Sequence, residues 1–523
     1  MIFYPFRCNR LHELGGKMTF QLGKKHLQFS LLIIFTMVLL LGCQSENTVS
    51  TETTQLSTET SETNEATEAT TTEKPAAKIT ASITSDDIIY FIMVDRFADS
   101  DPDSNLSDVN KEDMRAFQGG DLQGVIDHLD YIKSLGATAI WLTPVMTNGP
   151  NGYHGYWIYD FESVDPHFGD MATLQSLVNK AHDMDIKVIL DYVVNHTGYN
   201  SPWLSDPDKA DWFHPDKPLN NFKDVNELET GWLAGLPDLD QSNPEVKDYF
   251  INNAIWWIDQ TGIDGFRLDT MRHVSHEFWQ DFSGAIKEKY PDFFLLGEVW
   301  DGNTNTLESY HEDGIDSLTN YSLYNGIINA FNVKPNILSL ANALEKEKNF
   351  STPTENALFI DNHDNARFMS QNPKNKLEYT KLALAFTYTY PAIPVIYYGT
   401  EIAMDGAYDP VNRAFMDFSK AEVSDETNLI PYLQFLTKIK ATYSEGFQLI
   451  YRDKSTMVYE ISKDNNRLLV VLNASESEQT ISFDYTEAVL LTELTSGESL
   501  TFQSGSNTLI LPPLMGQFYI ISN

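Results

Sequence analysis

The chain has 523 residues, of which 42% are hydrophobic and 12% aromatic, as is ordinary for globular proteins. This length suggests about two to four domains, or one large α/β barrel with additions. The formal net charge of −38 argues against nucleic acid or an anionic membrane surface as a partner, but not against a neutral ligand. The two cysteines, Cys8 and Cys43, precede the globular part, which excludes a disulfide framework and a cysteine metal site.

Residues 1–43 are predicted to be a lipoprotein-type signal peptide. Two lysines, Lys24 and Lys25, precede an apolar run over 29–41 that ends in Gly42-Cys43. A basic flank, an apolar core and a small residue are typical of a secretory signal. The ending Leu40-Leu41-Gly42-Cys43 resembles the bacterial lipoprotein signal, in which the cysteine is lipidated and begins the mature chain. A plain membrane anchor is the alternative, but the run is short for a span of roughly 20 residues.

The signal predicts an extracellular protein that is lipid-anchored to the cell membrane through Cys43, with no other membrane contact. Met18 is a plausible true start, because a signal that begins there has the usual layout. Residues 44–82 are rich in Ser, Thr and Glu and have too little apolar surface to fold. We expect them to be a disordered, acidic linker between the anchor and the globular body.

Strand and helix patterns then alternate along the chain. The expected strands lie at 88–94, 137–142, 187–194, 263–268, 293–296, 315–323, 356–360 and 393–397, the sixth being the poorest. The expected helices lie at 122–135, 174–184, a segment ending at 260, 278–290 and 377–388. Eight alternating units predict an α/β protein with a (β/α)8 TIM barrel.

Two additions interrupt and follow this pattern. The barrel is expected to occupy 83–196 and 244–425, with a Pro- and Asp-rich insertion subdomain over 197–243 after the third strand. Short strands separated by Gly, Asn and Ser turns predict a C-terminal all-β domain, a β-sandwich, over 426–523.

Ionisable residues gather where four of the predicted strands end. Arg267 and Asp269 lie on one face of their strand, so that Arg267 would keep Asp269 ionised. Glu298 and Asp364 follow two later strands, and His196 and His363 add two imidazoles. Catalytic groups of such barrels lie at these strand ends. A single buried ion pair could have a structural role alone, but four polar strand ends together favour a catalytic site. Carboxylates that converge on one site favour glycoside hydrolysis.

Five motifs at and near these strand ends resemble the conserved regions of the α-amylase family, retaining α-glucan enzymes on a (β/α)8 barrel. They begin at Asp191 (DYVVNH), Gly265 (GFRLD), Gly297 (GEVW), Phe359 (FIDNHD) and, inside the insertion, Leu236 (LPDLD). The resemblance implies that Asp269 is the nucleophile, Glu298 the general acid/base and Asp364 the transition-state stabiliser. It further implies substrate contacts by His154, Tyr156, His196, Arg267, Arg272, His273, His363 and Arg367.

Calcium is the cofactor to be expected, at one or two sites. The loop with Asp99, Asp101 and Asn105 is dense in oxygen ligands, although it could be a merely solvated acidic loop. With Gly119 and Asp121 it resembles a site of cyclodextrin glycosyltransferases and related amylases. Asn195, Asp238 and the carbonyl of His273 match the family's site between barrel and insertion.

The expected activity is that of an α-amylase, which hydrolyses internal α-1,4-glucosidic bonds of starch, glycogen and maltooligosaccharides with retention of configuration. The glycosyltransferases usually carry a large aromatic residue where this chain has Ala234, so water should compete as the acceptor. The alternatives are a cyclomaltodextrinase- or neopullulanase-like enzyme, a cyclodextrin glucanotransferase-like enzyme, and, from another class, a noncatalytic glucan-binding lipoprotein. We expect a monomer whose partner is an α-glucan, with no nucleic acid.

Overall fold

The structure is a computed structural model that describes residues 82–101, 105–332 and 334–522. The predicted signal peptide and nearly all of the linker lie outside these residues, so both stay predictions. Among the described residues, no helix has the length and apolarity needed to cross a membrane.

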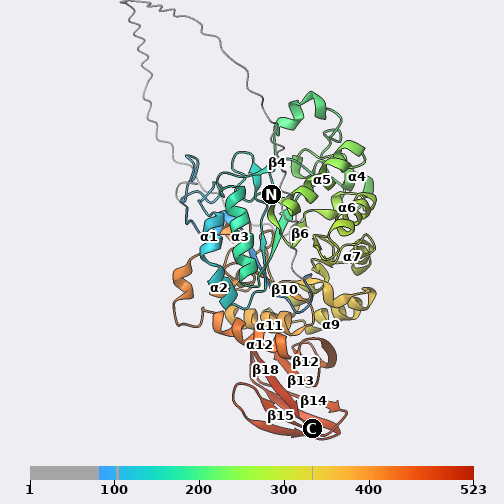
Figure 1. The fold of residues 1–523 in the computed structure, drawn as a ribbon. Helices are drawn as coiled ribbons and strands as arrows, with labels where there is room; N and C mark the ends of the chain where they lie inside the picture. Colours follow the sequence, from blue (N-terminus) through green and yellow to red (C-terminus); the bar gives the residue numbers. More distant parts are fainter. Residues whose placement is uncertain (1–81, 102–104, 333, 523) are drawn as a thin grey trace, which may run out of the picture. The chain divides into compact units, whose positions relative to one another are not determined.

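A barrel of eight parallel strands lies at the centre (Figure 1). The strands are β1 (Ile89–Ile92), β2 (Ala139–Leu142), β5 (Lys187–Tyr192), β6 (Gly265–Leu268), β7 (Phe294–Gly297), β8 (Ser317–Leu318), β9 (Ala357–Leu358) and β10 (Ile393–Tyr397). They pair in the order β8-β7-β6-β5-β2-β1-β10-β9. An isolated parallel bridge between Thr319 and Ala357 joins the two ends of this sheet. The predicted (β/α)8 barrel is confirmed.

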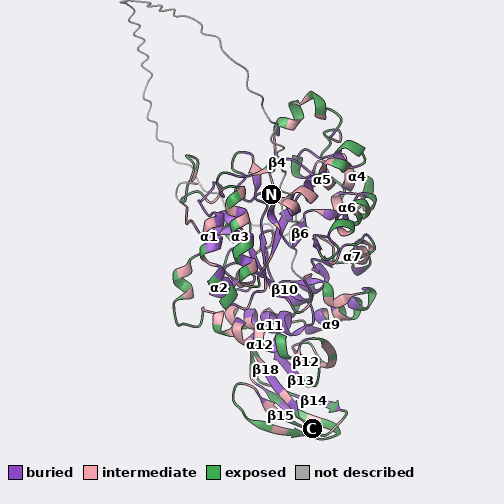
Figure 2. Cartoon of the chain, viewed as in Figure 1, coloured by how far each residue is buried: buried purple, intermediate pink, exposed green. Residues whose placement is uncertain are grey.

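The barrel strands are buried, as their colour in Figure 2 shows. Helices cover the outside of the barrel, and the buried side chains of the strands fill its inside. The covering helices are α1 (Leu122–Asp127), α2 (Leu129–Ser134), α3 (Met171–Asp183), α5 (Pro244–Thr261), α6 (His276–Lys289), α7 (Thr304–His311), α8 (Tyr321–Ala330), α9 (Ile337–Lys346), α10 (Phe368–Gln371), α11 (Lys376–Thr389) and α12 (Ile430–Tyr443). Gly262 ends α5 at φ 74°, where its N–H donates to the Ile258 carbonyl, and thereby turns the chain into β6.

Two predicted elements differ most from the structure, and the strand expected over 356–360 is the shorter β9. The helix expected over 122–135 is two short helices, because His128 departs from helical geometry between α1 and α2. The strand expected over 315–323 is only β8, Ser317–Leu318, since α8 begins at Tyr321. The side chain of Asn320 caps α8 by accepting from the Leu323 N–H, which ends the strand early.

The insertion after β5 contains little regular structure. A short helix, α4 (Val225–Thr230), packs against the 3-10 turn Met271–His273 that follows β6. Isolated bridges join His196 to Asp238 and Phe213 to Leu239. The insertion is therefore fixed directly above the carboxyl ends of β5 and β6.

The C-terminal domain begins later than predicted. Residues 426–443 contain α12, which packs on α11 and belongs to the barrel, so the all-β domain starts at β11. Its strands are β11 (Gly446–Arg452), β12 (Thr456–Lys463), β13 (Asn466–Asn473), β14 (Gln479–Tyr485), β15 (Val489–Glu493), β16 (Ser499–Phe502), β17 (Gly505–Leu511) and β18 (Met515–Ser522). A six-stranded sheet and the β14-β17 pair enclose a shared apolar core, as a β-sandwich does.

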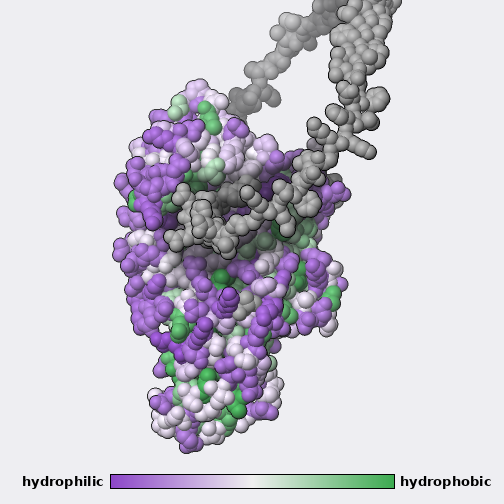
Figure 3. Space-filling model, turned by 180° about the vertical axis from the view of Figure 1, so that it is seen from behind, coloured by the Kyte–Doolittle hydropathy of each residue, from purple (hydrophilic) through white to green (hydrophobic). Residues whose placement is uncertain are grey.

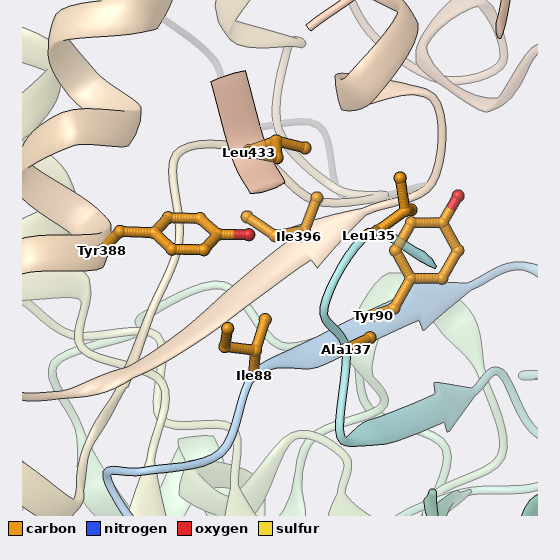
Figure 4. Close-up of a pocket in the computed structure, with 7 residues that line it drawn as sticks. All are labelled: Ile88, Tyr90, Leu135, Ala137, Tyr388, Ile396 and Leu433. Carbon is orange, nitrogen blue, oxygen red and sulfur yellow. The ribbon is translucent and has the colours of Figure 1, made fainter. Parts of the chain in front are cut away.

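Apolar surface is scattered rather than concentrated on the face drawn in Figure 3, which is largely hydrophilic. A small apolar pocket lies between β1, β10 and the helices outside them (Figure 4). Its lining residues are Ile88, Tyr90, Leu135, Ala137, Tyr388, Ile396 and Leu433. With no charged group in this lining, it is a packing defect of the barrel wall and not a site for a polar substrate.

Candidate active site

Three carboxylates meet at the carboxyl end of the barrel. Asp269 directly follows β6, Glu298 directly follows β7, and Asp364 lies six residues beyond β9. Asp269 and Glu298 are buried, at 5% and 6% exposure, and Asp364 is partly exposed. Parallel strands deliver their last residues to one rim, and this brings together residues that are nearly 100 positions apart in the chain.

Arg267 joins the carboxylates of this rim. Its Nη1 lies 2.8 Å from Asp269 Oδ1 and 3.0 Å from Asp191 Oδ2, and its Nη2 lies 2.9 Å from Glu298 Oε2. The guanidinium is 1% exposed, so these charge-assisted bonds act without screening by bulk water. Arg267 therefore orients the carboxylates, and besides Asp269, which its own strand suggested, it contacts two more, Asp191 and Glu298.

Glu298 and Asp364 are held in opposite protonation states. Burial raises the pKa of Glu298 to about 8, against the pull of Arg267 and with a contribution from Asp269. Burial alone would raise the pKa of Asp364, but His363, Arg413 and Arg267 beside it hold that pKa below its usual range. One protonated and one ionised carboxyl group at neutral pH is the arrangement that acid-assisted bond cleavage requires.

Arg413 and His363 position Asp364. Arg413 Nη2 lies 3.2 Å from Asp364 Oδ1, and His363 Nε2 lies 3.0 Å from Asp364 Oδ2. Arg413 Nε and Asn412 Nδ2 both donate to the His363 carbonyl, at 2.9 and 2.8 Å. The loop after β10 thus clamps the strand end that carries Asp364.

Aromatic side chains form one wall of the site. The rings of Tyr156 and His363 are parallel, with centroids 5.2 Å apart, and the Tyr156 hydroxyl donates to Asp191 Oδ2 at 2.7 Å. Among the described residues, His363 Nδ1 is a buried nitrogen without a hydrogen-bond partner, and its contact with a sugar hydroxyl stays a prediction. His154 and His196 are buried behind Tyr156, whose N–H and carbonyl they bind.

Arg272 and His273 lie at the rim, in the turn after β6. Arg272 Nη1 donates to the Trp300 carbonyl at 3.1 Å and pairs with Asp301 at 3.4 Å. His273 is partly exposed, and its Nδ1 lies 3.2 Å from the Leu228 carbonyl of the insertion. Arg272 therefore contacts the loop after β7 and His273 contacts the insertion, and their contact with substrate stays a prediction.

The prediction of Arg367 as a sugar contact is wrong. Arg367 is fully buried, and its guanidinium donates to the carbonyls of Tyr398 and Asn412 at 2.6 and 3.0 Å. Through its bond to the Asn412 carbonyl, Arg367 supports the loop after β10 from the protein interior. The arginine of this loop that reaches a catalytic carboxylate, that of Asp364, is Arg413.

Sequence reasoning missed Arg413 and gave Asp191 no role of its own. Asp191 accepts hydrogen bonds from Arg267, Tyr156 and Trp141, and burial raises its pKa to about 7. Asp191 stands on β5 at the same level as Arg267, with which it is in register, and this spacing could have identified it. Arg413 lies in an irregular loop, and no periodicity points to it.

The residues predicted for calcium between barrel and insertion fit a hard cation. Asn195 Oδ1 and Asp238 Oδ1 are buried and, among the described residues, without hydrogen-bond partners. The other carboxylate oxygen of Asp238 accepts from His214 Nδ1 at 2.8 Å, and burial raises the pKa of Asp238 to about 7. Buried orphan oxygens on the two sides of the His196–Asp238 bridge are suited to a bound cation.

The loop with Asp99, Asp101 and Asn105 fits less well. Asn105 Oδ1 is a buried orphan beside Gly119, but Asp99 pairs with Lys111 Nζ at 2.6 Å. Asp121 caps α1 by accepting from the Gly124 N–H, and its other oxygen accepts from the Asp101 and Ser100 N–H groups. Residues 102–104 of this loop lie outside the described part. No cluster of three His, Cys, Asp or Glu side chains able to hold a metal occurs within the described residues.

A (β/α)8 barrel with a carboxylate nucleophile, a protonated carboxyl group and a third carboxylate at one rim defines a glycoside hydrolase. Residues 91–477 match the family model for the α-amylase catalytic domain. The chain belongs to the α-amylase family and is a retaining glycoside hydrolase.

Known proteins support this assignment over most of the chain. A β/α-amylase from Paenibacillus polymyxa is 36% identical over 448 residues, 81% of this chain, which spans only 37% of that protein's length. A cyclomaltodextrinase from a Bacillus species is 34% identical over 76% of this chain and 74% of its own length. The crystal structure of an α-amylase from Geobacillus thermoleovorans with acarbose is 40% identical, with a TM-score of 0.78, over 84% of this chain and 99% of that one.

Proposed function

We propose that the protein hydrolyses α-1,4-glucosidic bonds of cyclodextrins and maltooligosaccharides, in addition to starch, as an enzyme of the cyclomaltodextrinase or maltogenic amylase type. The carboxylate set around Arg267 supports the chemistry. The names of the curated relatives support the substrate class: beside the Bacillus cyclomaltodextrinase they include a maltogenic α-amylase from Bacillus acidopullulyticus and a neopullulanase from Thermoactinomyces vulgaris, each 32% identical. This alternative is better supported than our first expectation of a plain α-amylase.

The plain α-amylase is the second candidate, because the Geobacillus structure named as one is 40% identical over nearly its whole length. Ala234 favours hydrolysis over glycosyl transfer in both cases. Its carbonyl accepts from the Tyr199 hydroxyl at 3.0 Å, but its methyl group offers no ring on which an acceptor sugar could stack. A noncatalytic binding protein would not require the complete carboxylate set.

The mechanism follows from the positions of the carboxylates. Asp269 attacks the anomeric carbon while the protonated Glu298 donates its proton to the leaving glycosidic oxygen. Asp364 stays ionised and stabilises the positive charge that develops on the sugar ring. Glu298, now ionised, takes a proton from water, which hydrolyses the glycosyl ester at Asp269. Two displacements return the original anomeric configuration.

The test is a product profile of the purified globular body on β-cyclodextrin, pullulan and starch. Cleavage of cyclodextrin faster than starch, with maltose as the main product, would support the proposal. Rapid loss of iodine staining with little cyclodextrin cleavage would favour the second candidate. Consumption of none of the three would contradict both.

We expect kcat/KM to fall by about tenfold per pH unit above the pKa of Glu298, which is about 8. The raised pKa keeps Glu298 protonated below this pH, and loss of that proton removes the general acid. Initial rates with a natural oligosaccharide between pH 5 and 10 measure this limb. If kcat/KM already begins to fall near pH 5, burial does not raise the pKa of Glu298.

We propose that calcium binds at Asn195 and Asp238, with the carbonyl of His273, and that it would tie the insertion to the barrel. A chelator should lower the melting temperature by about 5 °C, because a ligand that binds only the folded state stabilises it. Asp238→Asn should remove most of this dependence, whereas Asn105→Ala, in the other loop, should preserve it. Identical melting curves with and without chelator in the wild-type protein would contradict the proposal.

We also propose that the protein is a monomeric lipoprotein, anchored outside the cell through Cys43. Cys43→Ser should move the full-length chain from the membrane fraction into the soluble fraction, because the acceptor of the lipid is lost. Cell fractionation followed by mass spectrometry of the mature N-terminus measures this. Cys8→Ser is the matched control. A Cys43→Ser protein that remains with the membrane would exclude the lipid anchor.

A further inference from the structure

Thr270 directly follows Asp269 and has a backbone conformation that is rare for its residue type. Its φ is 46° and its ψ is 43°, in the left-handed region. Among the non-glycine residues with positive φ in the described part of the chain, Thr270 is the one that branches at Cβ. A branched Cβ makes this conformation costly, so it persists only where the surrounding contacts enforce it.

Contacts with the end of β7 and with α6 fix the turn that begins at Thr270. The N–H of the next residue, Met271, donates to the Glu298 carbonyl at 3.0 Å, and the Met271 carbonyl accepts from Trp279 Nε1 of α6 at 3.0 Å. The Met271 side chain is buried and fills the space beside Gly297, where a Cβ would lie 2.3 Å from its sulfur. These contacts from two neighbouring elements hold Thr270 in its costly conformation.

In this conformation both hydrogen-bond donors of Thr270 meet catalytic carboxyl groups. Its N–H donates to Glu298 Oε2 and its hydroxyl donates to Asp269 Oδ2, each at 3.1 Å. Arg267 binds the other oxygen of Asp269, Oδ1, and the same oxygen of Glu298, Oε2. Thr270 thus links the nucleophile to the acid/base a second time, independently of Arg267.

These donors restrict how each carboxyl group can react. Glu298 Oε2 faces two donors, the Thr270 N–H and Arg267 Nη2, so the proton of the acid form belongs on the other oxygen, Oε1. A carboxylate that is held at one oxygen can rotate about its Cβ–Cγ bond, and the second donor at Asp269 Oδ2 fixes its plane. Attack on the anomeric carbon is fast only when the reacting atoms are aligned, so the rate depends on this orientation.

We propose that Thr270 is a positioning residue of the catalytic pair: its hydroxyl fixes the plane of the Asp269 carboxylate, and its N–H directs the proton of Glu298 to Oε1. Asp269 then forms its bond to the anomeric carbon while the glycosidic C–O bond breaks, and the leaving oxygen takes the proton from Glu298 Oε1. Thr270 acts only through these two residues. The inference rests on the proposed function, because that function gives Asp269 and Glu298 their roles in α-glucan cleavage.

Thr270→Val tests the hydroxyl alone, because valine keeps the shape of the side chain and the backbone N–H. With maltoheptaose, kcat should fall by about tenfold to a hundredfold, since a hydrogen bond to a charged group is lost. KM should change by less than about twofold, because no substrate contact is removed. Maltosyl fluoride should show the same loss in kcat, because fluoride leaves without a proton from Glu298 but the reaction still needs Asp269.

Two further variants separate positioning from folding. Thr270→Ser restores the hydroxyl and should recover kcat to within about threefold of the wild type. Thr270→Ala lacks both the hydroxyl and the branched Cβ, so it should fold with less strain and still lose kcat as Thr270→Val does. Thr387→Val, which removes a buried hydroxyl that donates to the Ala383 carbonyl within α11, is the matched control and should retain wild-type kcat.

Equal kcat in the wild type and in both Thr270→Val and Thr270→Ala would overturn the inference, as would failure of Thr270→Ser to recover the rate or a rise in KM alone. A loss with maltoheptaose but not with maltosyl fluoride would also overturn it, because the hydroxyl would then act on Glu298. The proposed function fails in a different way: a wild-type protein that cleaves neither substrate would refute that function and this inference together.

Discussion

Asp269→Asn should abolish hydrolysis, with a loss in kcat of at least about 10⁴-fold, the scale seen when an enzyme loses its covalent nucleophile. The amide is nearly isosteric with the carboxylate but cannot attack the anomeric carbon. The bond from Arg267 Nη1 to Oδ1 can persist, since an amide oxygen also accepts, so the fold should survive. Release of reducing ends from maltoheptaose measures the rate.

Asp183→Asn, on the exposed side of α3, is the control and should have wild-type activity. Circular dichroism and the melting temperature establish that the Asp269→Asn protein is folded. Hydrolysis at a rate near that of the wild type would refute the assignment of Asp269 as the nucleophile and, with it, the two-step mechanism.

Arg267→Met should reduce both stability and activity. Arg267, whose side chain is 1% exposed, pairs with three carboxyl groups, those of Asp191, Asp269 and Glu298. Breaking a buried pair by removing one partner costs about 3–5 kcal/mol, because the remaining charge stays uncompensated. The carboxyl groups would take up protons to relieve this cost, which removes the nucleophile as well.

Denaturant unfolding should therefore give a lower midpoint for Arg267→Met, and kcat should fall by more than about 10³-fold. Arg467→Met, which breaks the partly exposed pair with Glu460 in the C-terminal domain, is the matched control and should cost about 1 kcal/mol or less. Arg267→Lys restores the charge but not the fork geometry, and should recover stability better than activity. Equal midpoints for Arg267→Met and Arg467→Met would contradict the central role of Arg267.

Local patterns were sufficient to predict the barrel and its carboxylates. Buried parallel strands are largely apolar runs, and Asp269 and Glu298 directly follow β6 and β7, which is why both could be placed at strand ends. The same approach failed where strands are two residues long, as at β8. The boundary of the C-terminal domain was placed too early because α12, whose buried residues Leu433, Leu436 and Ile439 recur at helical spacing, was not recognised as a last barrel helix.

Contacts between distant loops could not be predicted in this way. Arg413 and Arg367 both lie near the end of the barrel domain, and nothing in their local sequence indicates which one faces the substrate. The structure distinguishes them by what receives their N–H groups: backbone carbonyls for Arg367, and the carboxylate of Asp364 for Arg413. Calcium and the lipid anchor stay predictions for a different reason, because they depend on a bound ion and on a covalent modification.

The barrel sheet has its fewest strand-to-strand hydrogen bonds at the junction between β8 and β9. Each strand has two residues, and the bridge from Thr319 to Ala357 closes the ring there. Few ladder bonds mean that this seam opens locally at lower free energy than the longer pairs elsewhere in the ring. Glu298 follows β7, on one side of the seam, and Asp364 follows β9, on the other. The distance between the proton donor Glu298 and the charge stabiliser Asp364 thus depends less on the sheet than on the contact of Arg413 with Asp364. Within the barrel sheet, amide hydrogen exchange should be fastest along this seam.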